Sequence, residues 1–345
     1  MNSGTRKSVL ARSRGRLSFQ KLHRATILVL LVALCAIASF KSPTFLTWYN
    51  LVSNLFTNAA ALGVIALGMT FVMIAGCFDL SVASTTAVCS VVLVLVMNAF
   101  SSCGAPTAIS AALLVTAFVG IGLGSVNGIL IAYVGVNPFV VTLSTMLLFR
   151  GLALILTGGG QSLQVAEIAL RNRFTWFYDT QLPLFGHDHQ ISMPIVLFVV
   201  LFAMGIYLLK FMRFGHYIYA IGGNEEAAWL AGVNTRRIKA STYMLCGFTC
   251  AIAAVIFLAM TATAQPEAHM GRELTVIASV IVGGTPLGGG SGGLTLTLTG
   301  LLLLQLIENL LTQFNIGDAY RPVVTGLIIV VVVTIDVLAK RRTRA

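Results

Sequence analysis

Four ionisable side chains lie inside apolar stretches of this sequence, where a charge is costly unless it has a function or a partner. They are Asp79, Arg150, Glu308 and Asp336. Asp79 and Glu308 are carboxylates of the kind that a proton or sodium relay uses. Structural roles are open as well, since Asp79 can cap the next helix and Arg150 can pair with a helix end. Asp336 precedes Lys340 by one turn, which predicts an interfacial pair.

Two further polar side chains lie in apolar surroundings. Gln305 and Glu308 are three residues apart and share one face of a predicted helix. A polar face avoids lipid, so this face predicts either a cavity wall or a helix contact. Asn127 lies among small residues that permit helices to approach closely, which favours packing over ligand binding.

Metal, redox and nucleotide chemistry find little support. His187 and His189 form an HxH pair without a third ligand, and the six cysteines contain no CxxC pair. Cys246 and Cys250, four residues apart, share a helix face and predict plain packing. No GxxxxGK[ST] phosphate loop is present. We therefore expect no metal, cofactor or catalytic residue, and any use of ATP requires another polypeptide.

Residues 212–241 predict a short surface helix. Asn224 is a good N-cap, Glu225 and Glu226 complement the dipole of the first turn, and Gly232 ends the helix. Trp229 and Leu230 would then lie exposed on a helix of two turns. Exposed apolar residues with a polar rim are typical of a docking surface rather than of a solvated linker.

The elements that position these residues follow from composition. The chain has 345 residues, of which 57% are hydrophobic and 10% charged, and its mean hydropathy is +0.92. Soluble proteins carry about 25% charged residues, so a soluble fold is excluded. The net charge of +11 does not indicate nucleic acid, because half of the basic residues lie at the two ends of the chain beside apolar runs.

Apolar runs long enough for helices that cross a core of about 30 Å predict an all-α, polytopic membrane protein. Ten runs qualify, and the first has the alternative of a cleaved signal peptide that ends at Ala36-Ile37-Ala38. The runs are 25–40, 59–76, 84–100, 107–133, 139–157, 193–211, 242–263, 274–288, 294–311 and 321–338.

The distribution of Lys and Arg predicts the orientation. With both termini in the cytoplasm, the basic N-terminal tail (1–24), the loop 212–241 and the basic tail 340–345 lie inside, and they hold most of the basic residues. The loop 158–192 then faces the periplasm. The transmembrane domain is predicted to span residues 25–339, between the two tails.

Two glycine-rich segments interrupt this domain. Residues 74–80 (IAGCFDL) align with 281–287 (IVGGTPL), which indicates broken helices near a translocation path. Tight turns at the membrane face are the alternative.

Four stretches of the sequence together resemble the permease subunits of bacterial ABC sugar importers of the ribose, arabinose, galactofuranose and autoinducer type. The resemblance covers residues 45–338, and FDLSVAS (78–84), NEEAA (224–228) and Gln265-Pro266 most resemble the L-arabinose type. Cys77 departs from the family, which commonly has glycine there. The stretches are 68–82 (GMTFVMIAGCFDLSV), 137–151 (NPFVVTLSTMLLFRG), 222–232 (GGNEEAAWLAG) and 277–293 (IASVIVGGTPLGGGSGG).

The resemblance implies a multi-pass subunit in the bacterial inner membrane that moves a monosaccharide from a periplasmic binding protein into the cytoplasm. It implies an ATP-binding partner subunit, docked on residues 224–232 as a coupling helix, and a second copy of the chain. A proton- or sodium-coupled transporter that uses Asp79 or Glu308 is the alternative. The residues expected along the path are Asp79, Ser81, Asn137, Phe139, Thr142, Gln305 and Glu308.

Overall fold

The structure, a computed structural model, describes residues 29, 31–183, 190–267 and 269–317 and a few single residues between 320 and 334. The prediction of an all-α protein is confirmed, with 77% helix and 3% strand. The tails 1–24 and 340–345, the HxH pair and Asp336 lie outside the described residues.

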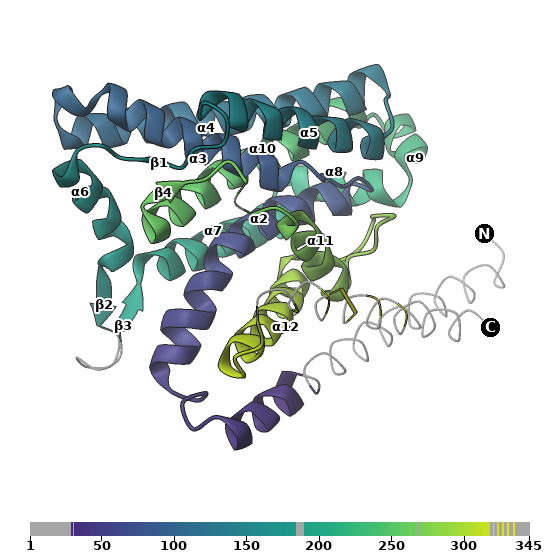
Figure 1. The fold of residues 1–345 in the computed structure, drawn as a ribbon. Coiled ribbons are helices and arrows are strands. Elements are labelled where there is room, and N and C mark those ends of the chain that lie inside the picture. The colour runs from purple at the N-terminus through teal and green to yellow at the C-terminus, as the bar shows by residue number, and fades with distance from the viewer. Residues whose placement is uncertain are drawn as a thin grey trace.

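The helices and strands follow one another along the chain as in Figure 1. They are η1 (Tyr49–Phe56), α2 (Thr57–Ile74), α3 (Val82–Ala99), η2 (Ser101–Cys103), α4 (Ala105–Ile129), η3 (Leu130–Val134), α5 (Pro138–Leu156), β1 (Leu163–Gln164), α6 (Ile168–Asp179), β2 (Gln181–Pro183), β3 (Gln190–Ser192), α7 (Met193–Phe211), α8 (Arg213–Gly223), α9 (Glu225–Leu230), α10 (Thr235–Thr261), β4 (Thr263–Ala264), α11 (Arg272–Val282) and α12 (Leu294–Gln313).

Seven of the ten predicted runs form helices long and apolar enough to cross a membrane within the described part of the chain. They are η1 with α2, α3, α4 with η3, α5, α7, α10 and α12. The run 274–288 differs from the prediction, because its helix α11 ends at Val282 after 11 residues, and residues 283–293 leave the helix. Of the first run, a helix covers 31–41, and most of the run 321–338 lies outside the described residues.

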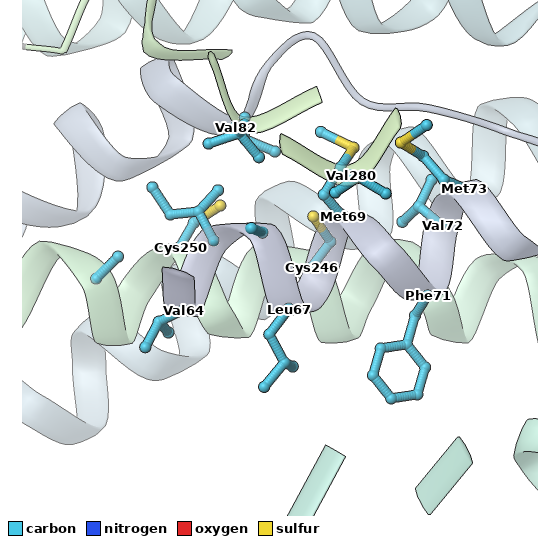
Figure 2. Packing of buried hydrophobic residues seen from close by; sticks show 14 of the residues in the cluster. Val64, Leu67, Met69, Phe71, Val72, Met73, Val82, Cys246, Cys250 and Val280 are labelled. Atoms are coloured by element: carbon cyan, nitrogen blue, oxygen red, sulfur yellow. The ribbon is translucent and has the colours of Figure 1, made fainter. Parts of the chain in front are cut away.

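Helix α2 forms the centre of the bundle. It is apolar on all sides, as a helix enclosed by others must be, and nearly all of its residues are buried. Figure 2 shows Met69 and Met73 of α2 near Cys246 of α10 and Val280 of α11. Cys246 and Cys250 are buried in this core, and both are free thiols, in agreement with a packing role.

Small residues bring α4 and α10 into close contact. A Cβ atom on Gly124 would lie 2.3 Å from the Tyr243 carbonyl oxygen, and one on Gly120 would lie 2.4 Å from the Gly247 carbonyl oxygen. Only glycine permits this approach of two backbones. Asn127 follows on the same helix and is buried beside these contacts.

The bundle has two distinct ends (Figure 1). At one end β1 pairs antiparallel with β4, and α6 lies nearby, so we call it the β1–β4 end. At the other end lie α8, α9 and the start of α10, and we call it the α9 end. The basic residues of the loop 212–241 lie at the α9 end, whereas Arg171 and Arg173 of α6 lie at the β1–β4 end.

Candidate functional site

The short helix predicted from Asn224 to Gly232 is confirmed as α9. The Asn224 side-chain oxygen accepts a hydrogen bond of 2.9 Å from the backbone N–H of Ala227, which is the N-cap geometry. Glu225 and Glu226 occupy the first turn, and Gly232 has a φ of 86° just after the helix. Few residues other than glycine adopt that conformation, so the helix ends there.

The outer face of α9 is apolar. The side chains of Trp229 and Leu230 are 64% and 72% exposed, although both are large and hydrophobic. An ion pair of 2.5 Å joins Glu225 to Lys239 of α10 and fixes the helix to the bundle. The arrangement presents an aromatic and an aliphatic side chain on a short helix anchored at its first turn.

Behind α9, three segments of backbone meet at glycine residues. The N–H of Gly290 donates a hydrogen bond of 2.9 Å to the carbonyl oxygen of Ile74 at the end of α2. A Cβ atom on Gly222 of α8 would lie 1.8 Å from that oxygen and 2.5 Å from the nitrogen of Gly290. We call Ile74, Gly76, Gly222, Gly289 and Gly290 the glycine junction.

The glycine junction brings the first glycine-rich segment, 74–80, against Gly289 and Gly290, which closely follow the second segment, 281–287. A Cβ atom on Gly289 would lie 2.5 Å from the nitrogen of Gly76, so the backbones of the two residues are in direct contact. The Tyr219 hydroxyl of α8 also donates a hydrogen bond of 2.9 Å to the carbonyl oxygen of Gly292. The sequence did not reveal Gly222 as the third member, because it lies inside a helix rather than in a turn.

Asp79 lies in the turn between α2 and α3 and is 3% exposed. Its Oδ1 atom accepts hydrogen bonds from the backbone N–H and the hydroxyl of Ser81, at 2.8 and 2.6 Å. The Asn127 side-chain amide of α4 donates to the hydroxyl of Ser81 at 2.9 Å and to both carboxyl oxygens of Asp79. Burial raises the pKa of Asp79, and the hydrogen bonds from Ser81 and Asn127 partly offset that effect. Asp79 thus closes a turn that leads into α3, but it does not cap that helix, because the N-cap residue is Ser81 and no side chain among the described residues accepts from the first-turn N–H groups of α3.

The start of α5 lies beside this turn. Asn137 caps α5 by accepting a hydrogen bond of 2.9 Å from the backbone N–H of Phe139, and both residues are exposed. The rings of Phe139 and Phe78 meet edge to face, with 6.3 Å between their centroids. Thr142 is buried, and its hydroxyl donates to the carbonyl oxygen of Pro138 in its own helix.

Gln305 and Glu308 occupy a different region. They lie on α12, which packs on α2, α7 and α11, whereas the Asp79 turn packs near α4 and α5. Gln305 is buried, and its Nε2 atom has no hydrogen-bond partner among the described residues. Glu308 is half-buried. The seven residues expected along a path therefore form two groups on different helices.

Arg150 of α5 faces the segment between β4 and α11. Its guanidinium donates a hydrogen bond to the carbonyl oxygen of Pro266, and its charge interacts with Glu273 and Glu267. His269 of the same segment stacks on Phe257 of α10 with 3.9 Å between ring centroids. Sequence reasoning identified Arg150 and noted Gln265-Pro266 for their resemblance to the L-arabinose type, but it did not place the two next to each other.

A cavity of about 420 Å³ lies between α4, α6, α7 and α10. Its walls are aliphatic and aromatic side chains, with Arg173 and Thr116 as the polar exceptions. A sugar needs polar partners for its hydroxyl groups, so this cavity does not fit one. Nor do the described residues contain a group of three or more His, Cys, Asp or Glu that could hold a metal ion.

Comparison with known proteins settles the family. The sequence profile described as "branched-chain amino acid transport system / permease component" matches residues 51–333. The chain belongs to this permease family. As a permease subunit it is not an enzyme, since ATP hydrolysis belongs to the partner subunit, and such subunits lie in the inner membrane. No solved structure matches the chain.

Several curated relatives align along nearly their whole length. The ribose import permease protein RbsC of Escherichia coli K12 is 34% identical over 328 residues, which cover 93% of this chain and 97% of the relative. RbsC of Bacillus subtilis is 35% identical over 306 residues, or 89% and 90% of the two chains. The L-arabinose permease AraH of E. coli K12 is 33% identical over 320 residues, or 90% and 89%.

Proposed function

We propose that this chain forms the membrane passage of an ATP-driven importer for a monosaccharide. The substrate is a pentose such as ribose or L-arabinose, or a hexose, delivered by a periplasmic binding protein. The carrying observation is the similarity to ribose and arabinose permeases along about nine tenths of both chains. The two sugars are represented at nearly equal identity, so identity alone does not select one of them.

The second part of the proposal is that α9 docks on the ATP-binding subunit. The exposed pair of Trp229 and Leu230 supports it, because an apolar face on an anchored helix is stabilised by a groove that removes it from water. The glycine junction supports it as well, because it connects the helix before α9 directly to α2 and to the loop before α12.

The third part is the topology. We propose ten spans with both termini in the cytoplasm, so that the α9 end is cytoplasmic and the β1–β4 end periplasmic. The basic residues gathered at the α9 end support this orientation. Single cysteines at Ser162 and Glu226, both exposed and at opposite ends, test it in a background in which Cys35 and Cys103 are serine. An impermeant thiol reagent should label Ser162→Cys in intact cells and Glu226→Cys only after permeabilisation.

The fourth part concerns the passage. Two cavities of the single chain, one between α4, α6, α7 and α10 and one between α7, α8 and α10, have mostly apolar walls, which favours a passage between two copies. We propose that Asn137 and Phe139 lie at its cytoplasmic mouth, with Asp79, Ser81 and Thr142 behind them. Gln305 and Glu308 contribute from α12.

Uptake by proteoliposomes tests the function. The chain reconstituted with its ATP-binding subunit, the binding protein and ATP should take up radiolabelled ribose or L-arabinose, and a protonophore should leave the rate unchanged. Omission of ATP or of the ATP-binding subunit is the control. Uptake by the chain alone, abolished by the protonophore, would instead establish a proton-coupled transporter that uses Asp79 or Glu308.

A further inference from the structure

The chain between β4 and α11 turns back along α10 instead of leaving the bundle. The His269 ring stacks on Phe257, which lies one turn before the end of α10, and the Arg272 guanidinium lies 5.8 Å from the centre of the same ring. Residues 269–272 therefore lie beside the last full turn of α10, on the bundle side of its end at Thr261.

The length of α11 places its first turn within the span. Its 11 residues are about 16 Å long, roughly half of a 30 Å hydrocarbon core. At its far end a Cβ atom on Gly283 would lie 2.9 Å from the Cα of Thr297, whose hydroxyl is 2.8 Å from that of Thr70. Thr70 is one turn from the end of α2 at the glycine junction. The start of α11 thus lies one helix length, about 16 Å, from Thr297 and Thr70, toward the β1–β4 end.

Charged side chains gather at this depth and are open to their surroundings. Glu267 and Arg272 are exposed, and Glu273 is half-buried with an Oε2 atom that has no hydrogen-bond partner among the described residues. Met270 and Leu274 beside them are 66% and 59% exposed. Exposed charges within a span do not face lipid, because they would lose their hydration there. This face therefore borders water.

Arg150 holds the segment in place. It is the thirteenth residue of α5, well within that span, and its guanidinium binds the carbonyl oxygen of Pro266 while its charge attracts Glu273 and Glu267. The segment is thereby fixed between α5 on one side and Phe257 of α10 on the other. Arg150 is in this sense a positioning residue, because it touches the segment rather than the space beyond it.

We propose that residues 265–267 and 269–273 line the outward part of the monosaccharide passage, an inference that rests on the proposed function. Hydroxyl groups of a neutral sugar donate to the carboxylates of Glu267 and Glu273 and accept from the guanidinium of Arg272. Charge-assisted hydrogen bonds at a few points, in an open and hydrated face, orient the sugar without holding it tightly. Tight binding belongs to the binding protein, since a tight site in the passage would slow release.

The labelling of introduced cysteines tests, without any transport assay, whether the face around Met270 and Leu274 borders water. In the background with Cys35 and Cys103 replaced by serine, Met270→Cys and Leu274→Cys are compared with Leu147→Cys, which is 66% exposed on α5 one turn from Arg150. A charged methanethiosulfonate should label positions 270 and 274 at least tenfold faster than position 147 in reconstituted vesicles. Equal rates at all three positions, or labelling at none, would overturn the proposal.

Sugar transport tests the contact itself. Glu273→Gln should lower uptake at least tenfold while ATP hydrolysis and assembly with the ATP-binding subunit stay normal. Glu167→Gln, an exposed carboxylate at the start of α6, should leave uptake unchanged. Normal uptake by Glu273→Gln would overturn its role. If the wild-type complex takes up no sugar, the proposed function fails, whereas the labelling still decides whether the face is wet.

The positioning role of Arg150 has its own readout. Arg150→Met should change the labelling rate of Leu274→Cys at least threefold, because the segment loses its anchor on α5. Arg150→Lys keeps the charge and a donor and should restore most of the wild-type rate. An unchanged rate in Arg150→Met would show that Arg150 does not hold the segment.

Discussion

The two ends of the bundle are built in opposite ways. At the α9 end, backbone touches backbone at Gly222, Ile74 and Gly290, and the carboxylate of Asp79 is enclosed by donors. At the β1–β4 end, α11 begins with an exposed Arg272 and a half-buried Glu273. Backbone segments packed this closely cannot deform gradually. A movement of α8 is therefore passed on to the segments that it touches. The β1–β4 end, with its exposed charges, is the end at which we propose contact with water and the sugar. We therefore propose that the α9 end transmits motion from the ATP-binding subunit, whereas the β1–β4 end contacts the sugar.

Of the substitutions at the α9 end, Gly222→Ala should have the largest effect on stability and transport. The added Cβ atom would lie 1.8 Å from the Ile74 carbonyl oxygen, and neither backbone can move aside without breaking the Gly290–Ile74 hydrogen bond. Overpacking costs typically about 1–3 kcal/mol, and a clash between backbones belongs at the upper end or beyond. We expect a large fall in the unfolding temperature of the purified subunit and loss of ATP-dependent uptake.

The neighbouring glycine is the matched control. A Cβ atom on Gly223 meets nothing within 4 Å, although Gly223 lies in the same helix. Gly223→Ala should therefore keep the unfolding temperature and uptake of the wild type. If Gly222→Ala behaves like Gly223→Ala, the three backbones are not in contact, and the contrast between the two ends is lost.

The sequence predicts features that depend on neighbouring residues, but not contacts between residues that lie far apart along the chain. Asn224, Gly232 and the exposed Trp229 were predicted correctly, because caps and helix ends are set by residues within one turn. The glycine junction joins residues 74, 222 and 290, and the segment 265–273 takes its position from Arg150 and Phe257. Contacts of such separation leave no local pattern. The short length of α11 was missed for a related reason, since hydropathy continues through Gly283 while the helix does not.

Asp79→Ala removes the buried carboxyl group and should cost about 1–3 kcal/mol, because it leaves the backbone N–H and the hydroxyl of Ser81 without their acceptor. Asp79→Asn keeps one acceptor oxygen and should cost less. Unfolding temperatures at matched expression measure both. Greater stability loss in the Asn variant than in the Ala variant would contradict the hydrogen-bonding role.

The pH dependence of the unfolding temperature, compared between the wild type and Asp79→Asn, gives an independent test. Burial raises the pKa of Asp79, so the folded protein binds a proton more tightly than the unfolded chain. That contribution to stability is complete below the unfolded pKa and is lost as the pH rises through the folded pKa. The difference in unfolding temperature, wild type minus Asp79→Asn, should therefore shrink as the pH rises from the acidic range toward neutral. A difference that grows over that range would contradict the shift.

Trp229→Ala tests whether the ATP-binding subunit docks on α9. Truncation of a buried aromatic anchor costs about 2 kcal/mol, or roughly 30-fold in affinity. We expect that loss in the binding of the ATP-binding subunit, measured at matched membrane expression, with an unchanged unfolding temperature because Trp229 is 64% exposed in the free subunit. Retention of the partner at wild-type affinity would show that α9 is not the docking element.

The ion pair between Glu225 and Lys239 should have the smallest effect. Its side chains are 48% and 16% exposed, and exposed pairs contribute about 0–1 kcal/mol, so Glu225→Gln should weaken partner binding by less than about fivefold. Glu226→Gln, exposed on the same turn, is the control and should be milder still. Because salt at about 1 M shortens the Debye length to roughly 3 Å, the difference between the two variants should fade there. A larger effect that persists at high salt would mean that Glu225 touches the partner directly, and α9 would then dock through its first turn as well as through Trp229.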